Sequence, residues 1–130
     1  TKQLLYATEN ALAEGIAAAK PGARLGDIGH AIQKTIEDAG FVVVKPLGGH
    51  GVGERVHEEP FIPNFGRQGE GEVLEEGMVL ALEPISSEGK AGVVLRSDGY
   101  TYATKDGSKS AHFEHTILIE KDGARVVTQA

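Results

Sequence analysis

The sequence of 130 residues contains no cysteine, which excludes a disulfide framework and a thiolate metal site. Basic residues are few, with 13 Lys and Arg against 19 Asp and Glu, and the net charge of -6 argues against nucleic acid or an anionic membrane as the main partner. No apolar run is long enough for a membrane span, and no signal-peptide pattern is evident. We therefore expect a soluble, cytoplasmic protein.

The apolar content is sufficient for one hydrophobic core. Hydrophobic residues make up 40% of the chain, and the 18 glycines are scattered rather than gathered in a linker. The sequence therefore predicts a single domain over residues 1–130.

Two amphipathic helices are predicted at the start of the chain. Residues 2–20 place Leu5 and Leu12 on one stripe at helical spacing. A second helix begins near Gly26, and Gly40 is a natural residue to follow its end.

The remainder of the chain is typical of a sheet, because short apolar runs alternate with turn residues. An Asp-Gly pair at 122–123 indicates a hairpin. Two helices followed by mainly antiparallel strands make an α+β domain. The predicted strands cover residues 41–44, 78–85, 92–96, 100–104, 111–120 and 124–128.

A glycine-rich stretch, GGHGVGERVHEEP at residues 48–60, carries two of the five histidines. Its four glycines disfavour a helix, so His50 and His57 are expected on a loop or at a strand edge. The start of an HExxH zinc motif is visible at His57, but Phe61 stands where the second His is required. This form of zinc site is therefore excluded.

Strand periodicity sorts the polar residues near the end of the chain. His112 and Glu114 fall on one face of a strand, and His115 falls on the other. In the strand over 78–85, Glu83 shares a face with apolar neighbours, so its carboxylate needs an Arg or a metal as partner.

One imidazole and two carboxylates, from His50, Glu83 and Glu114, would suit a divalent first-row metal. The spacing of these residues is not diagnostic by itself, and two other readings stay open. Glu83 and Glu114 could pair with Arg96 or Lys105 across the sheet, and His50 could hydrogen-bond its own glycine loop.

Six short motifs of the chain have a distinctive order and spacing: Gly49-His50-Gly51-Val52-Gly53, His57-Glu58-Glu59-Pro60, Ile62-Pro63-Asn64, Leu82-Glu83-Pro84, Asp98-Gly99-Tyr100-Thr101 and Phe113-Glu114-His115-Thr116. In this order and approximate spacing they resemble type I methionine aminopeptidases, and the resemblance covers effectively the whole chain. Prolidases and aminopeptidases P share the fold, but they usually have an Arg and another acidic context at the last of these motifs.

The resemblance implies a pita-bread fold and a centre of two divalent metal ions (Co, Mn, Fe, Ni or Zn) that hydrolyses the bond after the N-terminal methionine of nascent peptides. It makes His50 a ligand to one metal, Glu83 a ligand and proton shuttle, and Glu114 a carboxylate that bridges both metals. His57 would hydrogen-bond the scissile peptide and its tetrahedral intermediate.

Four further residues match family positions that line the methionine pocket or flank the site: Val56, Ile85, Tyr100 and His112. Three of these depart from the commonest residues of the family. His112 stands where Gln is frequent, Tyr100 where Trp is frequent, and Ile85 where Met is frequent.

A larger departure concerns two aspartate ligands and a further histidine, which the family carries upstream of the first helix predicted here. The chain therefore resembles the C-terminal half of a methionine aminopeptidase catalytic domain: a fragment, a truncated gene product or one chain of a split enzyme. We expect at most one weakly bound ion, an inactive isolated chain, and the missing N-terminal half or a second copy as partner.

Three alternatives stay open. The chain could be a non-catalytic binding module on the same fold, or one subunit of an assembled protein. It could also be a metallopeptidase of the prolidase or aminopeptidase P kind.

Overall fold

A computed structural model of the chain describes residues 2–44, 48–52, 58–88, 93–95, 102–104 and 110–128. Within these residues two helices, α1 (Lys2–Ala18) and α2 (Leu25–Asp38), precede the strands, which confirms the predicted α+β class. No helix in the described part is long and apolar enough to cross a membrane. The strands are β1 (Val42–Val43), β2 (Gly48–Gly51), β3 (Glu58–Pro63), β4 (Val79–Leu82), β5 (Ile85–Ser87), β6 (Val93–Leu95), β7 (Tyr102–Thr104), β8 (Ser110–His112), β9 (His115–Glu120) and β10 (Gly123–Val126).

The apolar stripe of α1 differs by one residue from the predicted one. Leu5, which was expected on the buried face, is 50% exposed, whereas Leu4 is 1% exposed. Adjacent helical residues differ by about 100° around the axis, and the small residues Ala7 and Ala11 place the closely packed face on the side of Leu4. The prediction from sequence spacing was based on the large side chains and gave too little weight to the alanines.

Helix α2 follows its predicted pattern closely. Ile28, Ile32 and Ile36 recur every four residues, and each is fully buried. At its start, the Asp27 carboxylate accepts a hydrogen bond from the Arg24 backbone N–H at 2.7 Å. Past its end, Gly40 adopts φ +91°, the left-handed conformation expected of a residue that follows a helix.

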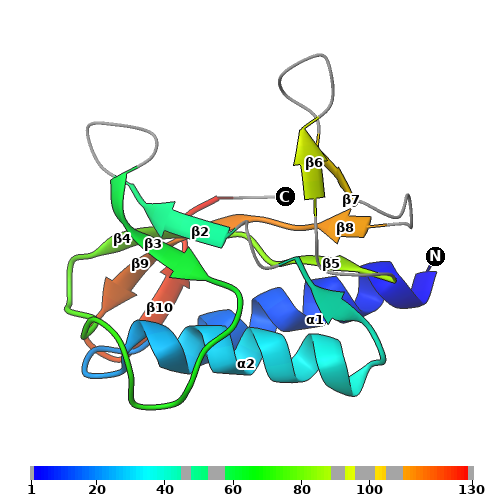
Figure 1. Cartoon of the computed structure of the whole chain (residues 1–130). Coiled ribbons are helices and arrows are strands. Elements are labelled where there is room, and N and C mark those ends of the chain that lie inside the picture. The colour runs from blue at the N-terminus through cyan, green and yellow to red at the C-terminus, as the bar shows by residue number, and fades with distance from the viewer. Residues whose placement is uncertain are drawn as a thin grey trace.

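The strands form three groups. A five-stranded sheet has the order β10-β9-β4-β2-β3, a three-stranded sheet has the order β1-β5-β8, and β6 pairs with β7. All the strand pairs are antiparallel. Figure 1 shows α1 and α2 side by side beneath the two larger sheets. The core lies in this layer, where side chains of β4 and β9 pack against the helices: Leu80, Leu82, Ile117 and Ile119.

Two strands predicted to be continuous are each broken in the structure. The run over 78–85 divides into β4 and β5 at Glu83-Pro84, and the run over 111–120 divides into β8 and β9 at Phe113-Glu114. Proline has no N–H to donate to a ladder, which accounts for the interruption at Pro84. The two breaks lie at the same level of the antiparallel pair, because the Phe113 N–H donates to the Pro84 carbonyl at 3.2 Å.

The pairing register is the same on both sides of this double break. Continued through the break, it places Glu83 directly opposite Glu114. Both candidate carboxylates therefore lie where the ladder opens. The pairs that flank the break are Leu82 with His115 and Ile85 with His112.

Candidate metal centre

The three predicted ligands come together at the opening between the strands. His50, Glu83 and Glu114 each offer one ligand atom, and these atoms all lie within 4.8 Å of one another. His50 pairs with Ala81 of β4, two residues before Glu83, so the side chains of His50 and Glu83 point to the same face of the sheet. Residues that are far apart in the sequence thus form one compact group, here called the His-Glu-Glu cluster.

The two carboxylates of the cluster are unfavourable neighbours in the absence of a cation. Like charges directly opposite each other on paired strands destabilise a sheet. Glu83 is largely shielded, with a side chain that is 16% exposed, whereas Glu114 is exposed. A positive charge between Glu83 and Glu114 would remove this repulsion. Arg96 and Lys105, the alternative partners, lie outside the described residues.

His50 is oriented by a contact with its own backbone neighbour. Its Nδ1 lies 3.0 Å from the Gly51 carbonyl oxygen, which can only accept, so Nδ1 carries the hydrogen of this bond. In the neutral ring this leaves the lone pair on Nε2, the atom that lies 2.7 Å from Glu83 Oε2. A lone pair and a carboxylate oxygen at that separation need a cation between them, either a proton or a metal ion.

Glu83 is held in its ionised form. Burial raises the pKa of Glu83, but the hydrogen bond from His112 and the charge of His50 outweigh burial, and the pKa lies below its usual value of 4.5. His112 Nε2 lies 3.3 Å from Glu83 Oε1, and this hydrogen bond raises the pKa of His112 above its usual value of 6.5. At neutral pH Glu83 is therefore a carboxylate, the form that binds metal ions.

Close packing of strands explains the glycines around His50. A Cβ atom added at Gly49 would lie 2.1 Å from the Ala81 carbonyl oxygen, so only glycine allows β2 to approach β4 this closely. Strand β2 lies between β4 and β3, so His50 occupies an inner strand rather than the expected loop or strand edge. Gly49 therefore serves the pairing of β2 with β4, and Gly48 serves its pairing with β3, where an added Cβ would lie 2.5 Å from the Ile62 carbonyl oxygen.

Asn64 supports the cluster, although sequence reasoning did not single it out as a site residue. Its side chain is 1% exposed, and its Nδ2 donates to the backbone carbonyl of Glu83 at 2.7 Å. This bond holds the backbone of Glu83, where the ladder is interrupted. The motif Ile62-Pro63-Asn64 could have drawn attention to Asn64, because a polar residue there follows two apolar residues at the end of β3.

The structure describes only some of the remaining predicted residues. Ile85 is half-buried on the same face as Glu83, and His115 points to the other face, as predicted. His115 Nδ1 lies 2.9 Å from the Thr128 hydroxyl. Three predicted site residues lie outside the described residues: Val56, His57 and Tyr100.

The donor set of the cluster fits a divalent first-row metal. An imidazole nitrogen and two carboxylates are the ligands that Mn, Fe, Co, Ni and Zn accept, whereas Mg and Ca prefer oxygen alone. His50 also has the fixed tautomer that metal-binding histidines show, with the other ring nitrogen donating to a carbonyl.

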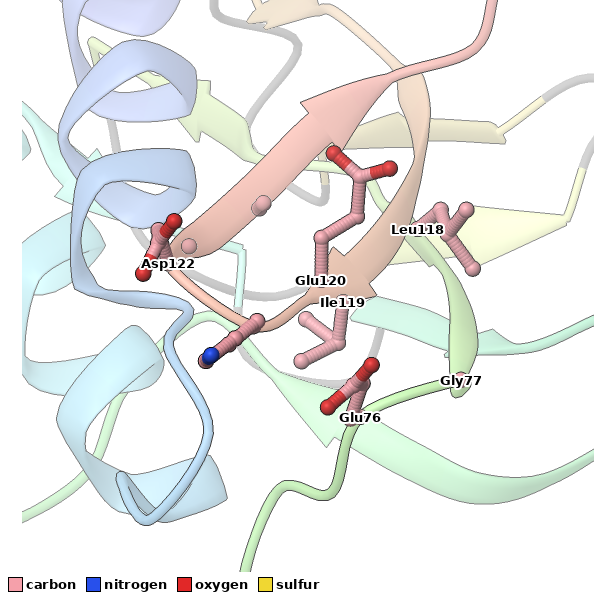
Figure 2. Close-up of a pocket in the computed structure, with 9 residues that line it drawn as sticks. Glu76, Gly77, Leu118, Ile119, Glu120 and Asp122 are labelled. Atoms are coloured by element: carbon pink, nitrogen blue, oxygen red, sulfur yellow. The ribbon is translucent and has the colours of Figure 1, made fainter.

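A second acidic region lies elsewhere on the sheet. A hollow of about 640 Å³ is lined by residues of the β9–β10 hairpin and by Glu76 and Gly77 (Figure 2). Figure 2 shows the carboxylates of Glu76, Glu120 and Asp122 pointing in different directions. Glu120 already pairs with Arg125 at 3.1 Å. This hollow contains none of the cluster residues and offers no convergent set of ligands.

Known proteins with similar sequences are methionine aminopeptidases. The chain is 47% identical over 128 residues to methionine aminopeptidase 1 of Bacillus subtilis, covering 98% of this chain and 52% of that protein. It is 44% identical over 129 residues to methionine aminopeptidase B of Synechocystis, covering 99% and 47%. The chain thus spans about half the length of the curated relatives it matches.

Solved structures agree with these similarities. The methionine aminopeptidase of Thermotoga maritima superimposes with a TM-score of 0.95 at 51% identity, over 99% of this chain and 52% of that one. A prolidase from Pyrococcus horikoshii superimposes with a TM-score of 0.71 at 26% identity, over 99% of this chain and 31% of that one. These matches confirm the predicted half of a pita-bread fold.

The family of the chain follows from a match that includes the whole His-Glu-Glu cluster. The model of metallopeptidase family M24 matches residues 1–121. The match takes in both helices and the double break that carries Glu83 and Glu114. The chain belongs to metallopeptidase family M24.

Proposed function

We propose that this chain supplies part of the metal centre of a methionyl aminopeptidase, a hydrolase that removes the N-terminal methionine of nascent peptides in the cytoplasm. The observation that carries the proposal is the His-Glu-Glu cluster, with its ligand atoms within 4.8 Å, in a chain 44–51% identical to methionine aminopeptidases. Identity to the prolidase is lower, at 26%, which favours an aminopeptidase over a prolidase.

Residues 1–130 are assigned to the C-terminal half of the catalytic domain, with three ligands of a two-ion centre. His50 would bind one ion, Glu83 would bind an ion, and Glu114 would bridge the two. A divalent ion (Co, Mn, Fe, Ni or Zn) at this place supplies a Lewis acid that polarises the scissile carbonyl and acidifies a water. With three ligands, the chain by itself holds at most one ion weakly.

Residues of this chain transfer the proton and contact the substrate. Glu83, ionised at neutral pH, accepts a proton from the attacking water and returns it to the amine that leaves as the C–N bond breaks. His57 would donate a hydrogen bond to the scissile peptide. Ile85, half-buried beside Glu83, would contact the methionine side chain together with Val56, Tyr100 and His112.

The remaining ligands of a two-ion centre have to come from another polypeptide segment. The relatives extend to about twice the length of this chain, so the segment that corresponds to their other half is the first candidate. A second copy of this chain is the other candidate. The cluster lies on the face of the sheet that is turned away from the buried side chains of Leu80 and Leu82, and an added segment could reach it there.

A peptidase assay tests the proposal. The 130-residue chain is incubated with Mn²⁺ or Co²⁺ and a Met-Ala-Ser peptide, with and without the N-terminal half of the Thermotoga maritima enzyme. We expect no methionine release from the chain by itself and measurable release from the mixture. His50→Ala and Glu114→Ala should abolish that release.

Other outcomes separate the alternatives. Preferential cleavage of a Met-Pro dipeptide would favour a prolidase, and a lack of hydrolysis in every mixture would favour a non-catalytic module. Turnover by the 130-residue chain alone at about 1 per second or more, a normal enzymatic rate, would contradict the incomplete ligand set.

A further inference from the structure

The carboxylate of Glu83 lies between two imidazoles, one on each oxygen. Oε2 is 2.7 Å from His50 Nε2, and Oε1 is 3.3 Å from His112 Nε2. The two histidines come from different strands, because His50 belongs to β2 and His112 to β8. Glu83 is therefore held from both sides.

These two contacts respond differently to a bound ion. The Nε2 atom of His50 is the metal-binding nitrogen, since Nδ1 is engaged with the Gly51 carbonyl. An ion on Nε2 takes the place of the hydrogen between His50 and Glu83, so that hydrogen bond is lost. The contact from His112 is made to the other oxygen, Oε1, and does not involve Nε2 of His50, so an ion there would not displace it.

His112 lies beside the cluster rather than in it. Among the described residues, the group with mutual ligand-atom separations within 4.8 Å consists of His50, Glu83 and Glu114. The His112 side chain is 49% exposed, and its contact is with the oxygen of Glu83 that faces away from His50. A hydrogen bond from such a place fixes the rotation of a ligating carboxylate.

We propose that His112 is a positioning residue for the metal centre, donating its Nε2 hydrogen to Glu83 Oε1 so that Oε2 faces the ion. This inference rests on the proposed metal centre of the preceding subsection. Without that donor, Glu83 is free to rotate about its terminal bond, and the repulsion from Glu114 turns it away from the position opposite His50. Partners of this kind usually affect metal affinity by 10- to 100-fold.

Titration with Co²⁺ tests the role without reference to activity. Affinity is measured by calorimetry, and the visible absorption of bound Co²⁺ reports the number and type of ligand atoms. His112→Ala removes the donor, so we expect affinity to fall about 10- to 100-fold with the absorption bands preserved at saturation. His112→Gln keeps an N–H donor on a side chain of similar reach, and its affinity should stay within about 3-fold of the unsubstituted chain.

A matched control uses another histidine of the same chain. His30 lines the groove between α1 and α2, together with Glu14 and Lys34. His30→Ala should leave Co²⁺ affinity and absorption unchanged. Urea unfolding of each variant confirms that the variants compared are folded.

Each remaining outcome is decisive. Equal affinity of His112→Ala and the unsubstituted chain would overturn the positioning role, as would an equal loss in His112→Gln. Altered absorption bands in both variants would make His112 a direct ligand and would also overturn it. If the unsubstituted chain is folded but binds no Co²⁺, the proposed metal centre itself fails.

Discussion

Glu83 and Glu114 lie opposite each other across the double break in the antiparallel pair formed by β4, β5, β8 and β9. The register on both sides of the break is preserved, so their juxtaposition is set by backbone pairing. Two carboxylates in facing positions repel each other, and this repulsion is relieved by a shared cation. The pair therefore lowers the stability of the metal-free chain.

The first prediction concerns this repulsion. Glu114→Gln should raise the free energy of unfolding of the metal-free chain by about 0.5 kcal/mol, because one of two facing negative charges is removed. With Mn²⁺ present the order should reverse, since the unsubstituted chain gains stability from a ligand that the variant binds poorly. Urea unfolding with EDTA and with Mn²⁺ measures both values.

Glu14→Gln on α1 is the control and should show no reversal. A metal-free Glu114→Gln less stable than the unsubstituted chain would contradict the repulsion.

The second prediction concerns metal stoichiometry. Calorimetric titration of the 130-residue chain with Mn²⁺ or Co²⁺ should give at most one weak site, because the cluster supplies three ligands. His50→Ala and Glu83→Ala should each remove the binding signal. Two tight sites on this chain would mean that residues outside the His-Glu-Glu cluster complete the centre.

A third prediction tests the close approach of β2 to β4. Gly49→Ala places a Cβ 2.1 Å from the Ala81 carbonyl, so the strands must move apart. The chain should lose about 1–3 kcal/mol of unfolding free energy, as at other overpacked sites. It should also lose metal binding, because His50 moves with β2. Gly26→Ala is the matched control: its Cβ would lie 2.2 Å from the Arg67 carbonyl, away from the cluster and from Asn64. It should lose stability to a similar degree and keep the metal-binding ligands in place.

The fourth prediction concerns pH and the start of α2. Hydrogen bonds from the backbone N–H groups of Arg24 and Gly69 hold the pKa of Asp27 below its usual value of 3.8. A carboxyl with a lowered pKa in the folded state stabilises the chain above the unfolded value, and this contribution is lost as the pH falls through the folded value. Asp27→Ala should therefore cost about 1 kcal/mol near pH 6, and less as the pH falls below about 3.8.

Urea unfolding at a series of pH values measures this difference. Asp38→Ala serves as the control, because within the described part of the chain the Asp38 carboxylate forms an exposed ion pair with Lys34 at the other end of α2 and no other ion pair or hydrogen bond. It should show little loss near pH 6. A constant difference between Asp27→Ala and the unsubstituted chain down to about pH 2.5 would contradict the role of the ionised carboxylate.

Local pattern was sufficient for most of the secondary structure. The buried isoleucines of α2, the turn at Asp122-Gly123 and the alternation along residues 111–120 each follow from periods or turn chemistry that act over a few residues. The same alternation placed His112 and Glu114 on one face and His115 on the other, as the structure has them. The choice of Leu5 as a buried residue was wrong, because the sides of an alanine-rich helix are distinguished only by what packs against them.

The sequence by itself determined the chemistry available to the site: one imidazole in a glycine-rich segment and two carboxylates within runs of strand-forming residues. Their metal-binding roles, and those of Val56, His57, Ile85, Tyr100 and His112, stay predictions. Only the tertiary structure decided that β2 lies beside β4, that Pro84 interrupts the ladder, and that Glu83 meets His50, His112 and Glu114 there. The physical reason is that strand pairing joins residues far apart in the chain, and its register depends on the packing of the whole sheet.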